Sequence, residues 1–209
     1  AIEAKKQGIH SLILPRENAL EAALIEGLQI FGMDNLRDTI RFLQGRPQAP
    51  IKRRQTLPTH LTYASDFSQI KGQEKAKRAI EIAVAGSHNL LLVGPPGAGK
   101  TMMAQRIPSI MPPMSLDEII ETTQIHSIVG KLSTDHPLVT ERPFRALHHS
   151  ITATALIGGR TNPQPGEISL AHQGVLFLDE LPEFQRNVLE LLRQPLEERK
   201  VPISRAHGT

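Results

Sequence analysis

The chain has 209 residues, a formal net charge of +3 and no cysteine. This length holds one or two domains with a real core. The lack of cysteine excludes a disulfide framework and a cysteine-based zinc site, as in proteins of the reducing cytoplasm. No apolar run approaches the roughly 20 residues of a membrane span, and no signal peptide is visible. We therefore expect a cytoplasmic protein without a membrane partner, in which any nucleic-acid contact is local because the net charge is small.

Residues 1–45 predict a partial small α/β domain. Its expected elements, in order, are a strand at 8–15 closed by proline, a helix at 19–26 capped by Asn18, a strand at 28–31, and a helix opened by Asp34 or Asn35. Residues 46–66 are rich in proline and lack clean periodicity, which favours an extended linker. A second domain is expected over residues 67–209, and its first helix, at 74–85, has an apolar face. Gln73, in the Gly-Gln turn before that helix, is a candidate for lining an adenine pocket.

Residues 94–101 fit the pattern G-x-x-x-x-G-K-[S/T]. The apolar run 89–93 before them predicts a buried strand, and the residues after them predict a helix. A strand, a glycine-rich turn and a helix N-terminus direct backbone N–H groups at one spot, which suits a phosphate. The predicted ATP-binding residues are Gly94, Pro95, Pro96, Gly97, Ala98, Gly99, Lys100 and Thr101. Lys100 would reach the terminal phosphates, and the Thr101 hydroxyl would ligate Mg²⁺.

A second acidic element must complete such a site. Residues 174–178 form a continuous apolar run that predicts a central parallel strand, and two acids follow it directly. Ligand sites of open α/β sheets lie at the carboxyl ends of the strands. Asp179 is therefore expected to hold Mg²⁺, and Glu180 to orient and deprotonate the water that attacks the γ-phosphate.

Further elements are expected between and after these motifs. They are a helix from 115 to about 125 with an S-x-x-E capping box, a strand at 144–150, a short helix at 150–156, a helix with a leucine stripe running toward 199 and disturbed by Pro195, and an exposed strand or hairpin from 201.

His148 and His149 invite a metal interpretation. Adjacent residues on a strand point to opposite faces, so we expect hydrogen-bonded packing and no shared ion.

The residue runs 144–149, 158–160, 165–172 and 174–184 resemble those of the magnesium-chelatase-like AAA+ ATPases of bacteria, in particular the YifB/ComM branch. The resemblance covers essentially the whole chain, and residues 1–45 are similar to the end of the Lon-protease-like domain of that branch. It implies a P-loop NTPase with a three-layer αβα core and a parallel sheet. It also implies a ring, usually a hexamer, and an insert at 160–173 in which residues 165–166 are the turn and 167–170 the returning strand.

The same resemblance implies a hairpin from residue 201, at which Arg205 matches a basic residue that touches DNA in related helicases. It places a sensor residue, an arginine finger and a helical lid beyond residue 209. We therefore expect a fragment that binds ATP and hydrolyses it poorly, because an arginine finger contributes about 10³–10⁵ in rate.

The sequence leaves three alternatives for the work that ATP hydrolysis would drive. The first is a ComM-like DNA motor for helicase or branch-migration work, which we favour because two hairpins suit a strand-gripping channel. The second is a metal-insertion motor, since chelatase subunits share this ATPase core. The third is a Lon-like protein-remodelling or protease-associated ATPase, although residues 1–45 contain no identifiable Ser-Lys dyad.

Overall fold

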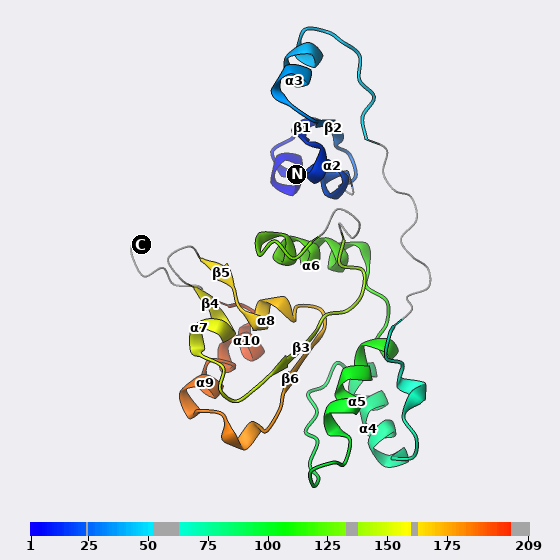
Figure 1. Cartoon of the computed structure of the whole chain (residues 1–209), viewed down its shortest axis with the longest axis vertical. Helices are drawn as coiled ribbons and strands as arrows, with labels where there is room; N and C mark the ends of the chain where they lie inside the picture. The colour runs from blue at the N-terminus through cyan, green and yellow to red at the C-terminus, as the bar shows by residue number, and fades with distance from the viewer. Residues whose placement is uncertain (24, 52–62, 133–137, 160–162, 202–209) are drawn as a thin grey trace. The chain divides into compact units, whose positions relative to one another are not determined.

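The computed structural model describes residues 1–23, 25–51, 63–132, 138–159 and 163–201. The chain divides into two compact units, Ala1–Thr59 with Leu132–Leu138, and His60–Lys131 with Val139–Thr209. Most helices and strands of both units are labelled in Figure 1. Among the described residues, no helix combines the length and apolar character needed to cross a bilayer.

The first unit is a small α/β arrangement. Its elements are α1 (Ile2–Lys6), β1 (Ser11–Pro15), α2 (Arg16–Ala22), β2 (Gln29–Met33) and α3 (Leu36–Leu43). Strands β1 and β2 pair in parallel, with Ile13 opposite Phe31. The apolar side of α2 packs on them around Ala19 and Ile30, which are almost fully buried. The predicted alternation of strands and helices in this piece is therefore present.

The caps of the two longer helices of this unit differ from each other. Asn35 caps α3, because its side-chain oxygen accepts a hydrogen bond from the Asp38 N–H at 3.0 Å. The expectation for Asn18 is wrong. Helix α2 begins at Arg16, directly after the strand, so Asn18 is the third residue of the helix and does not occupy the N-cap position.

The first residues of the predicted linker lie against this unit. The Gln48 side chain donates to the Gly32 carbonyl at 2.8 Å, and the Ile51 N–H donates to the Ile30 carbonyl at 2.7 Å. Two backbone carbonyl groups of β2 thereby accept hydrogen bonds from the linker residues. Residues 52–62 of the predicted linker lie outside the described residues.

The second unit begins with a helical layer that carries the phosphate-loop motif. It consists of η1 (Phe67–Gln69), α4 (Glu74–Ala85), α5 (Lys100–Arg106) and η2 (Ile107–Ile110). Phe67, Ile80 and Met103 are buried together in its core. Helix α4 agrees with the predicted span 74–85, and α5 follows the glycine-rich turn as expected (Figure 1).

The predicted strand at residues 89–93 is wrong for the described part of the chain. These residues pair with no described strand, and Leu91 and Val93 are 69% and 87% exposed. A strand requires a neighbour that completes its backbone hydrogen bonds, and an apolar run alone does not supply one. The glycine-rich turn therefore follows a segment that pairs with no described strand.

Two strands and a long helix lie at the centre of the rest of this unit. The helix is α6 (Leu116–Ile128), and the strands are β3 (Phe144–Leu147) and β6 (Val175–Leu178). The predicted capping box is confirmed, since Ser115 and Glu118 exchange hydrogen bonds between side chain and backbone. Strands β3 and β6 are parallel, with Leu147 opposite Leu178. The parallel pairing expected for the strand before Asp179 is thus present, in a sheet that has two strands among the described residues.

The inserted segment differs from the expectation. Its elements are α7 (Ala153–Ile157), β4 (Gly158–Gly159), β5 (Gln164–Pro165) and α8 (Glu167–Leu170). Residues 158–159 pair antiparallel with 164–165, so a short hairpin exists, but Pro165 lies in its second strand and is not its turn. The expected returning strand at 167–170 is wrong, because those residues form helix α8. Arg160 and its two successors lie outside the described residues.

The chain after β6 forms η3 (Leu181–Glu183), α9 (Arg186–Glu190) and α10 (Arg193–Glu198). The predicted long helix is interrupted at residues 191–192, four and three positions before Pro195, whose ring is incompatible with the carbonyl four residues earlier. Leu189 and Leu192 pack against the core around Leu147 and Leu156, whereas Leu196 is exposed. The predicted leucine stripe therefore holds only for its first two members.

The fold class is mixed α/β with parallel strand pairs. The described residues form three two-stranded sheets, β1-β2, β3-β6 and β4-β5. The parallel pairs β1-β2 and β3-β6 agree with a mixed α/β fold of the P-loop kind, and β4-β5 is antiparallel. The three-layer core remains a prediction.

Candidate functional site

The two sequence motifs meet in the second unit, although 78 residues separate their polar groups in the chain. The Thr101 hydroxyl donates to Asp179 Oδ2 at 3.2 Å, and both side chains are half-buried. Thr101 lies in the first turn of α5, and Asp179 follows the last residue of β6. The fold thereby brings the last residue of the glycine-rich motif to the acidic strand end.

The glycine-rich turn adopts a conformation that requires glycine at two positions. Gly97 and Gly99 have φ angles of +77° and +80°, in the left-handed region that other residues rarely occupy. The Lys100 ammonium turns back over the loop and donates to the carbonyl oxygens of Gly94 and Pro95, at 2.8 and 2.9 Å. A flexible cation is therefore held at the mouth of a turn whose backbone can approach an anion closely.

Glu180 has an unusual backbone. Its φ of +55° and ψ of +50° place a non-glycine residue in the left-handed region, between the end of β6 and η3. Its side chain is 61% exposed, and one carboxylate oxygen lies 3.1 Å from His149 Nδ1. Strained backbone of this kind concentrates at functional sites, because surrounding structure must hold it. Glu180 is thus presented to solvent beside Asp179.

The position of the two histidines corrects the sequence analysis. Strand β3 ends at Leu147, so His148 and His149 lie in the turn after it and do not alternate between two faces. Their ring centroids are 3.9 Å apart. The hydrogen-bonded arrangement that we expected is present, but the argument that they cannot share an ion is wrong. The error came from the position of the strand end. The strand was expected to continue to residue 150, and periodicity alone does not show that it ends at Leu147.

Two further site residues were predicted, Gln73 and Arg205. Gln73 caps α4 from a left-handed backbone with φ of +57° and makes no side-chain cap hydrogen bond. Its assignment to an adenine pocket remains a prediction. Arg205, the predicted DNA contact, lies outside the described residues, as does the rest of the hairpin expected from residue 202 onward.

Arg142 connects the segment just before β6 with the capping box of α6. Its side chain is only 9% exposed and donates to the carbonyl oxygens of Pro112 and Gln173, at 2.6 and 2.7 Å. The same guanidinium pairs with Glu118 at 3.3 Å. Hydrogen bonds from Ser115 and the positive charge of Arg142 keep the pKa of Glu118 below its usual value, although burial opposes them. Sequence analysis had not singled out Arg142.

A second ion pair connects strand β3 with the inserted segment. Arg145 donates from Nε and Nη2 to the two carboxylate oxygens of Glu167, at 2.5 and 2.7 Å. This two-pronged hydrogen bond lowers the pKa of Glu167 and raises that of Arg145. Helix α8 is therefore fixed to β3 at its first residue.

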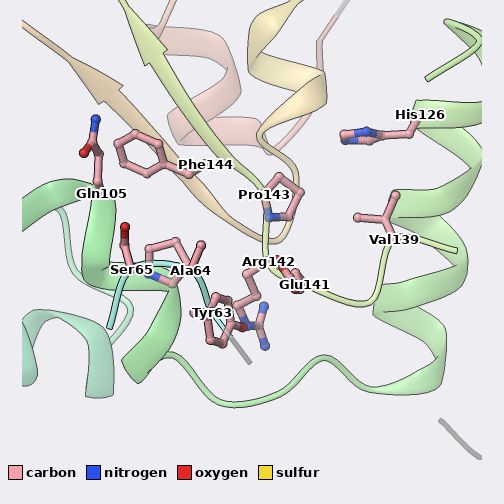
Figure 2. A pocket seen from close by; sticks show the side chains of 11 residues that line it. Tyr63, Ala64, Ser65, Gln105, His126, Val139, Glu141, Arg142, Pro143 and Phe144 are labelled. Atoms are coloured by element: carbon pink, nitrogen blue, oxygen red, sulfur yellow. The ribbon is translucent and has the colours of Figure 1, made fainter. Parts of the chain in front are cut away.

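A cavity of about 370 Å³ lies at the start of β3. Figure 2 shows the side chains that line it. Burial lowers the pKa of His126 and raises that of Tyr63, so both side chains line it in their neutral forms near neutral pH. Arg142 also lines it, but its donors are already engaged. Because nucleotide sites lie at the opposite, carboxyl ends of parallel strands, this cavity does not suit a phosphate.

Comparison of the sequence with known proteins identifies the family of the chain. A sequence model of the family described as magnesium chelatase, subunit ChlI, matches residues 66–209. The chain belongs to this family. The match begins just before η1 and includes both motifs of the magnesium-chelatase-like site.

The relatives place the chain in the YifB/ComM branch of the magnesium-chelatase-like family. It is 46% identical over 212 residues to the competence protein ComM of Haemophilus influenzae, covering 100% of this chain and 42% of that protein. It is 45% identical over 210 residues to the protein YifB of Salmonella typhimurium, covering 100% and 40%. Lon protease 2 of Bacillus subtilis is 29% identical over 155 residues, covering 68% of this chain and 27% of that protein. The chain spans about two fifths of the length of the first two relatives.

Proposed function

We propose that residues 94–101, Asp179 and Glu180 bind ATP and hydrolyse it, as in an AAA+ motor domain. The observation that carries the proposal is the hydrogen bond from Thr101 to Asp179, because it joins the phosphate-loop motif to the acidic strand end. Family membership supports a general ATPase activity. Backbone N–H groups of the glycine-rich turn bind the phosphates, and Lys100 leaves its two carbonyl partners for the terminal ones.

The residues at this point fit a magnesium ion. Mg²⁺ prefers oxygen ligands, and the Thr101 hydroxyl and the Asp179 carboxylate offer two oxygens within 3.2 Å of each other. Both groups would hold the ion, Thr101 directly and Asp179 through water. When bound, the ion neutralises charge on the β- and γ-phosphates.

Glu180 acts as the base in this proposal. Its carboxylate accepts a proton from water while the water oxygen forms a bond to the γ-phosphorus and the bond to the ADP oxygen breaks. His149, at 3.1 Å, positions the carboxylate by a hydrogen bond. Such general-base assistance contributes about 10²–10⁴ in rate.

For the longer protein we propose a ring-forming DNA motor of the helicase or branch-migration kind, with a hexamer as the expected ring. The similarity over the full chain to a protein named for competence favours DNA as the partner. A magnesium-chelatase-like metal-insertion motor is the first alternative, on the strength of the family match. A Lon-like protein-remodelling ATPase is the second, and the similarity to Lon protease 2 favours it.

The experiment that tests this function is Mg²⁺-dependent ATP hydrolysis by the full-length protein, with and without single-stranded and forked DNA. A DNA motor predicts strong stimulation that is reduced in Arg205→Ala, because a hairpin cation contacts phosphates. Hydrolysis that no DNA stimulates would contradict the DNA motor and favour the metal-insertion or protein-remodelling alternative. Absence of hydrolysis in every condition would contradict the ATPase itself.

A further inference from the structure

We propose that His148, His149 and Glu180 form a binding site for a divalent transition-metal ion, with Zn²⁺ as the best-matched ion. Each of the three residues offers one ligand atom, and these atoms all lie within 4.8 Å of one another. Among the described residues, they are the one group of three histidine and acidic side chains with this spacing. The binding goes beyond the proposed function, and its consequence for hydrolysis rests on that function.

The pairing of two strands explains why these residues meet. Leu147 and Leu178 are opposite each other at the ends of the parallel strands β3 and β6, which lie side by side in Figure 1. The Asp179 N–H continues the pairing by donating to the Leu147 carbonyl at 3.1 Å. The residues that follow each strand therefore emerge at the same edge, with His149 Nδ1 3.1 Å from Glu180 Oε2.

The ligand set is chemically suited to Zn²⁺. Two imidazoles and one carboxylate are the ligands of several zinc sites, and a water molecule completes a tetrahedron. Tetrahedral ligands about 2.0–2.1 Å from the ion lie roughly 3.3 Å apart. His148 and Glu180 are exposed, so a small rotation of their side chains closes the remaining distance. Mg²⁺ is disfavoured here because it prefers an all-oxygen octahedron.

His148 has a hydrogen-bonded partner beside the cluster. Its Nδ1 lies 2.9 Å from the Ser150 hydroxyl and 3.3 Å from the Ser150 backbone N–H. A backbone N–H can only donate, so Nδ1 accepts here and Nε2 carries the proton of the neutral ring. Binding of the ion through Nε2 requires that proton to move to Nδ1, where it can be donated to the Ser150 hydroxyl.

Occupancy of this site has a direct consequence for Glu180. A carboxylate bound to a metal ion is a much weaker proton acceptor, so the proposed base would be withdrawn. The phosphate-binding turn at 94–101 contributes no ligand to the cluster, and ATP binding would continue. Zinc would therefore act as an inhibitor of hydrolysis and not of nucleotide binding.

The test is a Zn²⁺ titration of the full chain in excess Mg²⁺, read by competition with a coloured zinc chelator. The absence of cysteine removes thiolates as competing ligands. We expect one Zn²⁺ per chain, and binding weakened about tenfold or more in His148→Ala, His149→Ala and Glu180→Gln. The matched control is His172→Ala, because His172 pairs with Glu121 at 3.1 Å outside any such group of three described residues.

Two outcomes of the titration would overturn the site. One is equal zinc affinity in the wild type and the three cluster variants, and the other is an equal loss in His172→Ala. Far-UV circular dichroism and the metal-free Tm establish that each variant is folded, and a zinc-dependent rise in Tm confined to the wild type and His172→Ala is the second readout.

The hydrolysis arm uses the full-length protein and compares each variant with its own zinc-free rate. We expect zinc to slow the wild type and to slow His148→Ala much less. Zinc binding without slowed hydrolysis would overturn the inhibitory role and leave the site. Absence of hydrolysis before zinc is added would instead contradict the proposed ATPase, while the titration result would stand.

Discussion

The Thr101 hydroxyl and the Asp179 carboxylate are joined by a 3.2 Å hydrogen bond across 78 residues of chain. Thr101 belongs to the first turn of α5, and Asp179 belongs to the turn after β6. Both side chains are half-buried. The contact places two oxygens together at the point where the proposed magnesium ion would lie.

Thr101→Ala should weaken Mg²⁺ binding in the nucleotide complex by about 10–100-fold, because an oxygen at the ion is lost. Thr101→Ser keeps the hydroxyl and should restore most of the affinity. The measurement is the Mg²⁺ dependence of ATP binding. Equal Mg²⁺ dependence in Thr101→Ala and Thr101→Ser would remove Thr101 from the metal site.

Glu180→Gln should keep ATP binding and lose hydrolysis by about 10²–10⁴-fold, since the amide cannot accept the proton from water. Glu183→Gln is the matched control, because Glu183 is an exposed carboxylate three residues further on. The rate of ATP hydrolysis by the full-length protein, under the condition that gives most activity, is the measurement. A Glu180→Gln protein as active as Glu183→Gln would require another base.

The meeting of the two motifs could be predicted from the sequence, whereas their surroundings could not. The glycine-rich turn and the Asp179-Glu180 pair follow from local patterns, and the structure brings Thr101 and Asp179 together. The expected strand at 89–93 fails because an apolar run does not specify a partner strand. The strand at 167–170 was implied by the family resemblance, whereas the structure has helix α8 there, between Gly166 at the N-cap and Ala171 at the C-cap.

The buried Arg142 was also beyond the reach of sequence patterns. Its partners lie 24, 30 and 31 positions away in the chain, so no spacing rule connects them. Periodicity identifies which residues face a core, and it does not identify which charged residue the fold will enclose.

Arg142→Met should lower the free energy of unfolding by about 2–4 kcal/mol, because it leaves two carbonyl oxygens without their donor and removes the positive charge that pairs with Glu118. Arg186→Met is the control, since the Arg186 side chain is 93% exposed, and it should change stability by less than about 0.5 kcal/mol. Urea unfolding followed by circular dichroism measures both. Equal stability of the two variants would show that Arg142 does not hold α6 to the start of β3.

The Arg145–Glu167 pair predicts a dependence of stability on pH. The pKa of Glu167 lies below its ordinary value of 4.5 in the folded chain, so the pair stabilises the fold above that pH and the benefit is lost as pH falls through the lowered pKa. Glu167→Gln should therefore be less stable than the wild type near about pH 7, by a margin that is smaller near about pH 3. Urea unfolding at the two pH values measures this, with Glu183→Gln as the exposed control. A deficit of Glu167→Gln that is the same at both pH values would contradict the assignment.

Binding of ATP by the wild type, Lys100→Ala and Lys75→Ala tests the central claim most directly. Lys100 Nζ is held at the mouth of the glycine-rich turn, whereas Lys75 is an exposed lysine of α4. Isothermal titration with Mg²⁺ and ATP should show binding by the wild type and Lys75→Ala and a loss of at least about 100-fold in Lys100→Ala, roughly 3 kcal/mol of charge-assisted contact. Equally tight ATP binding by Lys100→Ala would contradict the assignment of residues 94–101 as the phosphate site.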